Sequence, residues 1–277
     1  MKQIFSQNGR IKPLADAQIP ADKIEAMYGF GVYETMKVRK HILYFANEHI
    51  DRLLHSARCI KLDHLFTSEH IHQWIKQLVQ EAGEESINIK MLLMGGAQEA
   101  DATLYIFALP PLFPKRSWYK EGVTVKTVLY ERWMPQAKSL NMLPSYYYYT
   151  QAKSEGHYDV LFKDSQENVH EGSRTNLYVV QGNTLVTPPK DTVLEGVTMK
   201  SLERVIAKSS SFSLTYRPIS YDELCTAEGA FLSSTSTKII PIREIDGKPL
   251  SIPPQLVELI SLYNSSLEGS QGKMELL

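Results

Sequence analysis

A cluster of prolines near the middle of the chain constrains the fold more than any other feature of the sequence. In the run Leu109-Pro110-Pro111-Leu112-Phe113-Pro114, half of the residues lack the backbone N–H that a helix interior or a central strand needs. The chain has 277 residues, which is long for a single core, so we expect two domains joined at this break. The predicted boundaries are 1–110 for the N-terminal domain, 111–120 for the linker and 121–277 for the C-terminal domain.

The segment before the prolines shows both strand and helix patterns. Residues 31–38 alternate and are rich in β-formers, which predicts a strand. A helix is expected from Asn47, because apolar residues then recur at helical spacing, and a second amphipathic helix is expected at 68–82. Further strands are predicted at 87–94 and 103–109.

The segment after the prolines alternates short strands with helices. Predicted strands cover 123–130, 160–163, 177–180, 184–187, 230–233 and 239–242. Predicted helices cover 143–154, 198–208 and 256–263, the first with Pro144 in its opening turn. The residues from about Ser265 are polar, and we expect them to fray.

Composition excludes several classes of function. With 30 basic and 31 acidic residues the net charge is -1, which builds no field for nucleic acid or an anionic membrane. No apolar run approaches the roughly 20 residues of a membrane helix, and the N-terminus lacks the apolar stretch of a secretory signal. Cys59 and Cys225 show no metal spacing, and two histidines at i and i+2, His70 and His72, do not share a helix face. We therefore expect a cytoplasmic protein without a metal site.

The first candidate for chemistry is Lys138, which lies between a predicted strand and a predicted helix. A lysine placed there can project into a cleft, and a desolvated lysine forms an imine with an aldehyde. Taken alone, the lysine also fits a solvated surface position.

The second candidate is Glu171, which stands beside Gly172 in the run Val169 to Asn176. A glutamate beside glycine can approach a ring closely, and a carboxylate keeps the pyridine nitrogen of pyridoxal 5'-phosphate (PLP) protonated. The alternative is a plain turn between two strands.

Three further features suit an anion. The run Leu194 to Thr198 precedes a helix, whose N-terminal N–H groups bind phosphate, and the run Ser233 to Thr237 is rich in hydroxyl groups. Arg52 on the first helix could add a positive charge. The alternatives are a simple helix cap, a polar turn and a surface ion pair between Arg52 and Glu48.

The order and spacing of these features resemble the class IV aminotransferase family, the PLP enzymes of fold type IV. The family includes branched-chain and D-amino acid transaminases and aminodeoxychorismate lyases. The resemblance runs from about Tyr28 to Lys248. It is carried by Gly31-Val32-Tyr33-Glu34, His49-Ile50-Asp51-Arg52-Leu53, Lys138-Ser139-Leu140-Asn141, Glu171-Gly172-Ser173 with Asn176, Thr187-Pro188-Pro189, and the runs 194–198 and 242–248.

The resemblance implies a fold and a set of roles. The fold class is α/β and α+β, with a small N-terminal α+β domain and a larger C-terminal α/β pseudo-barrel, and the family is usually a homodimer. Lys138 is implied to be the Schiff-base lysine and proton carrier, Glu171 the partner of the pyridinium, and Tyr33 a residue on the substrate side. Leu194 is implied to pack on the ring. The implied phosphate ligands are Arg52, Val197, Thr198, Ser234 and Thr235, and Gly196 is implied to be a further cofactor-binding residue.

The sequence departs from the family pattern in several places, and the family's usual Asp-Arg-Gly is absent upstream of Tyr28. Gly29-Phe30-Gly31 stands where the family commonly has Gly-Asp-Gly. Gly95 stands where D-amino acid transaminases have an arginine that binds the substrate carboxylate. This departure disfavours a standard D-amino acid site, and Arg132 and Arg174 are candidate replacements for the lost charge.

The catalytic residues alone do not separate two reactions. Glu34-Thr35 looks like lyase members of the family, whereas Lys138 to Asn141 and Glu244 to Lys248 look like the D-amino acid transaminase branch. We expect an aminotransferase acting between a small amino acid and a 2-keto acid. The alternative is aminodeoxychorismate lyase, which releases pyruvate and 4-aminobenzoate in folate synthesis. A PLP-free binding protein on the same fold is a third hypothesis, which the complete ligand set disfavours. The donor and its L or D preference stay open.

Overall fold

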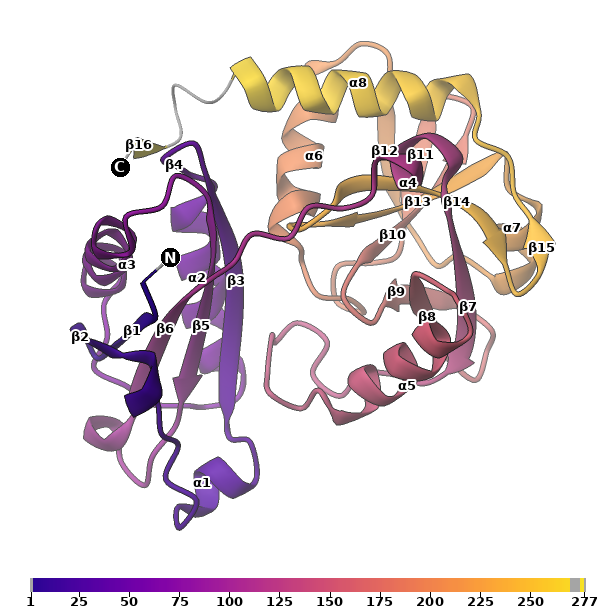
Figure 1. Ribbon diagram of the computed structural model, residues 1–277. Helices are drawn as coiled ribbons and strands as arrows, with labels where there is room; N and C mark the ends of the chain where they lie inside the picture. Colours follow the sequence, from indigo (N-terminus) through magenta and orange to yellow (C-terminus); the bar gives the residue numbers. More distant parts are fainter. Residues whose placement is uncertain (1, 270–274, 277) are drawn as a thin grey trace. The chain divides into compact units, whose positions relative to one another are not determined.

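The structure is a computed structural model that describes residues 2–269 and 275–276 (Figure 1). The chain forms two compact units. The first unit consists of Met1–Leu112, Ala137–Asn141 and Ser270–Leu277, and the second consists of Phe113–Gln136 and Met142–Gly269. The short segment Ala137–Asn141, which carries Lys138, therefore groups with the first unit. The predicted linker, 111–120, includes most of helix α4 (Arg116–Glu121).

The first unit is built on an antiparallel sheet. Among the described residues its seven strands lie in the order β16-β4-β3-β5-β6-β1-β2. The strands are β1 (Ile4–Gln7), β2 (Arg10–Pro13), β3 (Gly31–Arg39), β4 (Ile42–Leu43), β5 (Ile87–Met94), β6 (Thr103–Leu109) and β16 (Glu275–Leu276). The predicted strands at 31–38, 87–94 and 103–109 are confirmed as the centre of this sheet.

Helices α2 (Ala46–Cys59) and α3 (Ser68–Ala82) pack on one face of this sheet. Thr67 caps α3 by accepting a bond from His70 N, and Gly83 ends it at φ +70°, so the predicted bounds are confirmed. Alternate residues of β3 face the helices, namely Val32, Glu34, Met36 and Val38. Glu34 is thus a carboxylate at a core position. The unit also contains α1 (Ile24–Met27) and the short 3₁₀ helices Leu14–Asp16 and Glu99–Asp101.

The second unit contains a closed ring of strands. In its sheet β12-β11-β10-β13-β14-β7-β8-β9, strand β9 pairs with both β8 and β10, so six strands from β10 to β9 form a barrel. The strands are β7 (Val123–Leu129), β8 (Asp159–Lys163), β9 (Val169–Gly172), β10 (Asn176–Gln181), β11 (Thr184–Thr187), β12 (Ser213–Tyr216), β13 (Gly229–Ser234), β14 (Lys238–Ile245) and β15 (Lys248–Pro249). An apolar core fills the barrel, with Leu161, Leu177 and Leu232 among its fully buried residues.

The helices of the second unit also follow local signals. They are α4, α5 (Leu143–Ser154), α6 (Val197–Lys208), α7 (Tyr221–Thr226) and α8 (Pro254–Gly269). Pro144 lies in the first turn of α5 as predicted, and Ser220 caps α7 by accepting a bond from Glu223 N. Among the described residues, no helix is both long and apolar enough to cross a membrane.

Several elements differ from the sequence prediction. The sequence analysis did not predict helices α1, α4 and α7 or strands β1, β2, β4, β9, β12, β15 and β16, because each is six residues or shorter and shows little periodicity. The prediction that the chain frays from Ser265 is wrong for residues 265–269, which extend α8, and for residues 275–276, which form β16. Residues 270–274 and 277 lie outside the described residues.

Candidate active site

The backbone of Lys138 is held on strand β3 and helix α2 of the first unit. Lys138 O accepts a hydrogen bond from Tyr33 N at 2.9 Å, and Leu140 N donates to Gly31 O at 2.9 Å. Lys138 N donates to the hydroxyl of Ser56 at 3.0 Å. These bonds fix the residue in an extended segment, although it lies far along the chain from β3.

The side chains of Lys138 and Tyr33 lie together. The Lys138 ammonium nitrogen is 4.4 Å from the centroid of the Tyr33 ring, within the range of a cation–π contact. The structure therefore brings together two residues that the resemblance assigns to catalysis. Their catalytic roles stay predictions.

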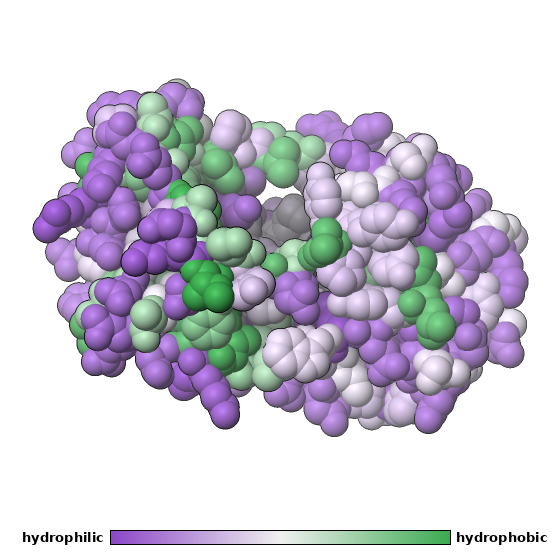
Figure 2. Space-filling model, turned by 90° about the horizontal axis from the view of Figure 1, so that it is seen from below, coloured by the Kyte–Doolittle hydropathy of each residue, from purple (hydrophilic) through white to green (hydrophobic). Residues whose placement is uncertain are grey.

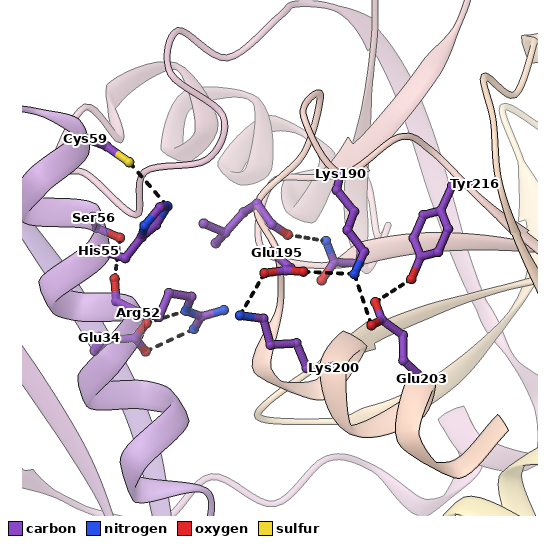
Figure 3. Close-up of polar contacts among 12 residues, drawn as sticks. Glu34, Arg52, His55, Ser56, Cys59, Lys190, Glu195, Lys200, Glu203 and Tyr216 are labelled. Atoms are coloured by element: carbon purple, nitrogen blue, oxygen red, sulfur yellow. Dashed lines mark hydrogen bonds and ion pairs between the residues drawn. The ribbon is translucent and has the colours of Figure 1, made fainter. Parts of the chain in front are cut away.

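Arg52 is buried on the sheet side of α2. Only 8% of its surface is exposed, so Arg52 does not lie at a solvated surface position. Its Nε donates to Glu34 Oε1 at 2.5 Å and its Nη2 donates to Glu34 Oε2 at 3.0 Å (Figure 3). The guanidinium thus forms a two-pronged ion pair with the carboxylate of β3.

His49 completes this buried cluster. Its Nδ1 lies 2.8 Å from Glu34 Oε2. Burial raises the pKa of Glu34, but Arg52 and His49 outweigh burial and hold that pKa well below its usual value. Burial lowers the pKa of His49, against the opposing effect of Glu34. We therefore assign an ionised Glu34 and a neutral His49 that donates from Nδ1.

Glu171 is buried at the end of β9 in the second unit. Its Oε1 accepts from Arg132 Nε at 2.7 Å, and its Oε2 accepts from Leu194 N at 3.1 Å. Arg132 also donates to Pro135 O. Arg132 is therefore bound to Glu171, and this contact disfavours its predicted role as a replacement carboxylate ligand.

Asn176 connects the other predicted segments of this unit. In the barrel it lies opposite Glu171 on β9 and opposite Ser233 on β13. Its side-chain N–H₂ donates to Leu194 O at 2.7 Å. A Cβ at Gly196 would collide with Asn176 Oδ1, so only glycine lets the loop pass this closely. Glu171, the run 194–196 and the end of β13 therefore meet at one end of the barrel.

Helix α6 presents its N-terminus at this loop. Its N-cap is Gly196, which has no side chain to bond the first N–H groups, and its first turn contains no acidic residue. Such an end attracts an anion. Val197 and Thr198 begin the helix and are buried, whereas Ser234 and Thr235 lie at the β13–β14 turn, where Ser234 Oγ bonds Thr237 Oγ1 at 2.7 Å.

The residues present fit PLP. The second unit offers a buried carboxylate for a protonated ring nitrogen and an uncapped helix end for a phosphate. The first unit offers a lysine beside a tyrosine ring and a buried arginine.

The surroundings of Arg174 and Gly95 indicate whether these positions could bind the substrate carboxylate. The Arg174 guanidinium lies 4.3 Å from the ring centroid of Tyr149 and 5.0 Å from that of Tyr158, and it donates to Tyr158 O. This packing disfavours Arg174 as a carboxylate ligand. At Gly95 a Cβ would collide with the Phe30 ring, so the position leaves no room for any larger side chain.

The sequence analysis missed His49, Ser56 and Asn176 as site residues. His49, Arg52 and Ser56 are spaced i, i+3 and i+7, so they share one face of α2 with the buried Ile50 and Leu53. These polar residues lie on the apolar face of the helix, and that position could have marked them as site residues. For Asn176 the family motif was the only sign.

Comparisons with known proteins identify a family for this chain. A sequence profile described as amino-transferase class IV matches residues 31–245. A D-alanine aminotransferase of Bacillus licheniformis is 27% identical over 276 residues, with 90% of each chain covered.

Solved structures extend the likeness to the whole fold. A branched-chain aminotransferase from Thermoproteus uzoniensis, solved with norvaline, has a TM-score of 0.88 at 26% identity, covering 98% of this chain and 96% of its own. The T.th. branched-chain amino acid aminotransferase, solved with pyridoxamine 5'-phosphate, has a TM-score of 0.87 at 23% identity, covering 97% of this chain and 95% of its own. The predicted combination of an α+β part and an α/β barrel is confirmed.

Proposed function

The chain belongs to the class IV aminotransferase family, and from that premise we propose that it moves the amino group of a small apolar L-amino acid to a 2-keto acid. Membership of the family, together with relatives that are named aminotransferases, indicates a transaminase with PLP as its cofactor. The lyase alternative is not favoured, because the named relatives are aminotransferases.

The preference for an L-amino acid is supported by Gly95. The D-specific members of the family place an arginine here for the substrate carboxylate, and in this chain the Phe30 ring fills the corresponding space. The D-alanine aminotransferase is 27% identical to this chain, so overall similarity does not separate it from the branched-chain enzyme at 26%. The proposed preference for an L-amino acid therefore rests on the absence of this arginine at Gly95.

Lys138 is proposed to move the proton. When bound, PLP withdraws electrons from the substrate Cα and makes its hydrogen acidic. The Lys138 amine would take the proton from Cα and deliver it to the C4' atom of the cofactor. The Tyr33 ring, 4.4 Å from the ammonium nitrogen, would limit the positions that the amine can adopt.

The remaining residues are proposed to bind and orient. Glu171 would keep the ring nitrogen protonated, with Arg132 and Leu194 N holding its carboxylate in place. Leu194 would pack on the ring. Arg52, Val197, Thr198, Ser234 and Thr235 are the proposed phosphate ligands, and Gly196 is proposed as a further cofactor-binding residue.

A homodimer in the cytoplasm completes the proposal. Around α1, Ile19, Ile24, Met27 and Tyr28 each expose more than half of their surface, and such apolar residues are typical of an interface. Figure 2 shows hydrophobic residues among the hydrophilic ones on one face. Cys59 and Cys225 are free thiols, which supports a reducing compartment.

The visible spectrum of the PLP-loaded protein tests the function. We expect L-valine, L-leucine and L-isoleucine to bleach the visible cofactor band and to yield their 2-keto acids, which chromatography detects. D-alanine should bleach it at least about tenfold more slowly, because an ion pair of about 1.4 kcal/mol is missing. Faster bleaching by D-alanine would overturn the L preference, and no bleaching by any amino acid would overturn the transaminase.

The matched control is Lys138→Ala. Borohydride should fix the cofactor covalently to the wild-type protein but not to this variant. Covalent fixation in the variant would show that another lysine carries the cofactor.

A further inference from the structure

We propose that Glu34 is a positioning residue for the cofactor phosphate, because it holds the Arg52 guanidinium in one orientation. The other edge of the guanidinium would then face the phosphate. This inference rests on the proposed function, since it takes Arg52 as a phosphate ligand.

The contacts between the two residues define the plane of the guanidinium. Nε and Nη2 of Arg52 reach the two carboxylate oxygens of Glu34 at 2.5 and 3.0 Å (Figure 3). A planar guanidinium bound through two N–H groups cannot rotate about its last side-chain bond without losing one of them. Glu34 thus selects one direction for the remaining N–H groups.

Glu34 is itself immobile. It is fully buried, and its Oε2 also accepts from His49 Nδ1 at 2.8 Å and from Thr35 N at 3.0 Å. It occupies an inward position of β3, between the apolar Val32 and Met36. An apolar residue there would pack without the cost of burying a charge. The presence of a carboxylate at this position is therefore better explained by the orientation that it imposes on the Arg52 guanidinium than by a contribution to folding stability.

The same turn of α2 also holds Lys138. Ser56 Oγ donates to Arg52 O at 2.7 Å and accepts from Lys138 N at 3.0 Å. One hydroxyl therefore connects the backbones of the proposed phosphate ligand and the proposed catalytic lysine. The orientation set by Glu34 is thus fixed relative to Lys138 within the first unit.

The test compares two ligands that differ only in the phosphate. Dissociation constants for PLP and for pyridoxal, which lacks the phosphate, are measured on the apoprotein of wild type and of Glu34→Gln. We expect the PLP constant to rise about 10- to 100-fold, as for a lost charged hydrogen bond, and the pyridoxal constant to change less than about twofold. Glu85→Gln, at an exposed position of the same unit, should change neither.

A double-mutant cycle separates positioning from general damage. If Glu34 acts through Arg52, the double variant Glu34→Gln with Arg52→Lys should bind PLP no more weakly than Arg52→Lys alone. Additive losses, or equal losses for PLP and pyridoxal in folded Glu34→Gln, would overturn the proposal. If Glu34→Gln fails to fold, Glu34→Asp keeps the charge, but its side chain is one methylene group shorter and its carboxylate would lie too far from Arg52 for both hydrogen bonds. It should show the same selective loss. A wild-type protein that binds neither ligand would refute the proposed function instead.

Discussion

At the scale of residues, the pKa values of two fully buried carboxylates shift in opposite directions because their neighbours differ. Asp159 accepts from the hydroxyls of Ser173 and Thr175 at 2.5 and 2.8 Å, and burial raises its pKa despite these bonds. Glu34 instead faces Arg52 and His49, which lower its pKa although burial opposes them. Asp159 therefore stabilises the turn after β9 through its hydrogen bonds. In this turn a Cβ at Gly172 would collide with Thr175. Glu34, in contrast, keeps its negative charge.

His49 should make the first unit sensitive to mild acid. Burial lowers its pKa below the ordinary value, and the positive charges of Arg52 and Lys138 act in the same direction, whereas Glu34 opposes them. Below about pH 6.5 the unfolded chain binds a proton that the folded protein excludes, so stability is lost as the pH falls. This group should therefore lower the free energy of unfolding as the pH falls from about 7.5 to 5.5.

Urea unfolding at the two pH values measures this effect. His49→Gln should make this loss of stability smaller, whereas His55→Gln, at an exposed position of the same helix, should leave the loss unchanged. An unchanged loss in His49→Gln would show that other groups cause the acid sensitivity.

At the scale of elements, helix α6 and the loop before it act together. Leu194 N donates to Glu171 and Leu194 O accepts from Asn176, so residues of the barrel bind both the backbone N–H and the backbone C=O of Leu194. Glu195 forms ion pairs with Lys190 at 3.0 Å and Lys200 at 2.7 Å on the outside of the same loop (Figure 3). These contacts fix the loop that precedes the uncapped N-terminus.

Gly196→Ala should weaken cofactor binding. The added methyl group would collide with Asn176 Oδ1 and separate Asn176 from Leu194, which shifts the loop and the first N–H groups of α6. We expect the dissociation constant for PLP, measured by absorbance titration, to rise about tenfold, as for loss of about 1.4 kcal/mol. Gly156→Ala adds a methyl group with nothing within 4 Å of its Cβ, but at φ +90° the backbone is strained for alanine. This control should lower the stability of the protein and leave the dissociation constant for PLP unchanged, and equal effects on that constant would contradict this account.

At the scale of the whole molecule, the two units are not consecutive segments of the chain. Residues 137–141 belong to the first unit but are flanked on both sides by residues of the second. Their backbone bonds to Gly31, Tyr33 and Ser56 join the two halves of the sequence within one sheet and its helix. The lysine proposed for catalysis lies on this crossing segment.

A cut in the proline-rich connection should not release an independent first unit. With a protease site inserted between Leu112 and Phe113, whose side chains are largely exposed, the cleaved halves should co-elute on gel filtration. The reason is that 137–141, carried by the C-terminal fragment, stays hydrogen-bonded to β3. Separate elution under native conditions would contradict this expectation, and separation in urea is the control.

The sequence by itself determined the local elements and the family. The bounds of α3 were predicted to the residue, because a repeating apolar face and two capping residues are encoded within one short run, from Thr67 to Gly83. The site residues came from motifs, each of which also lies within a few consecutive positions. Their assigned roles remain predictions.

Only the tertiary structure decided the contacts between distant segments. The closure of the barrel by β9, the pairing of Glu34 with Arg52 and the insertion of 137–141 into the first unit left no local pattern in the sequence. A hydrogen bond or a buried ion pair depends on where the folded chain brings two groups, and periodicity describes only neighbours along one element. The structure also showed Arg132 and Arg174 to be bound within the second unit, which no spacing could indicate.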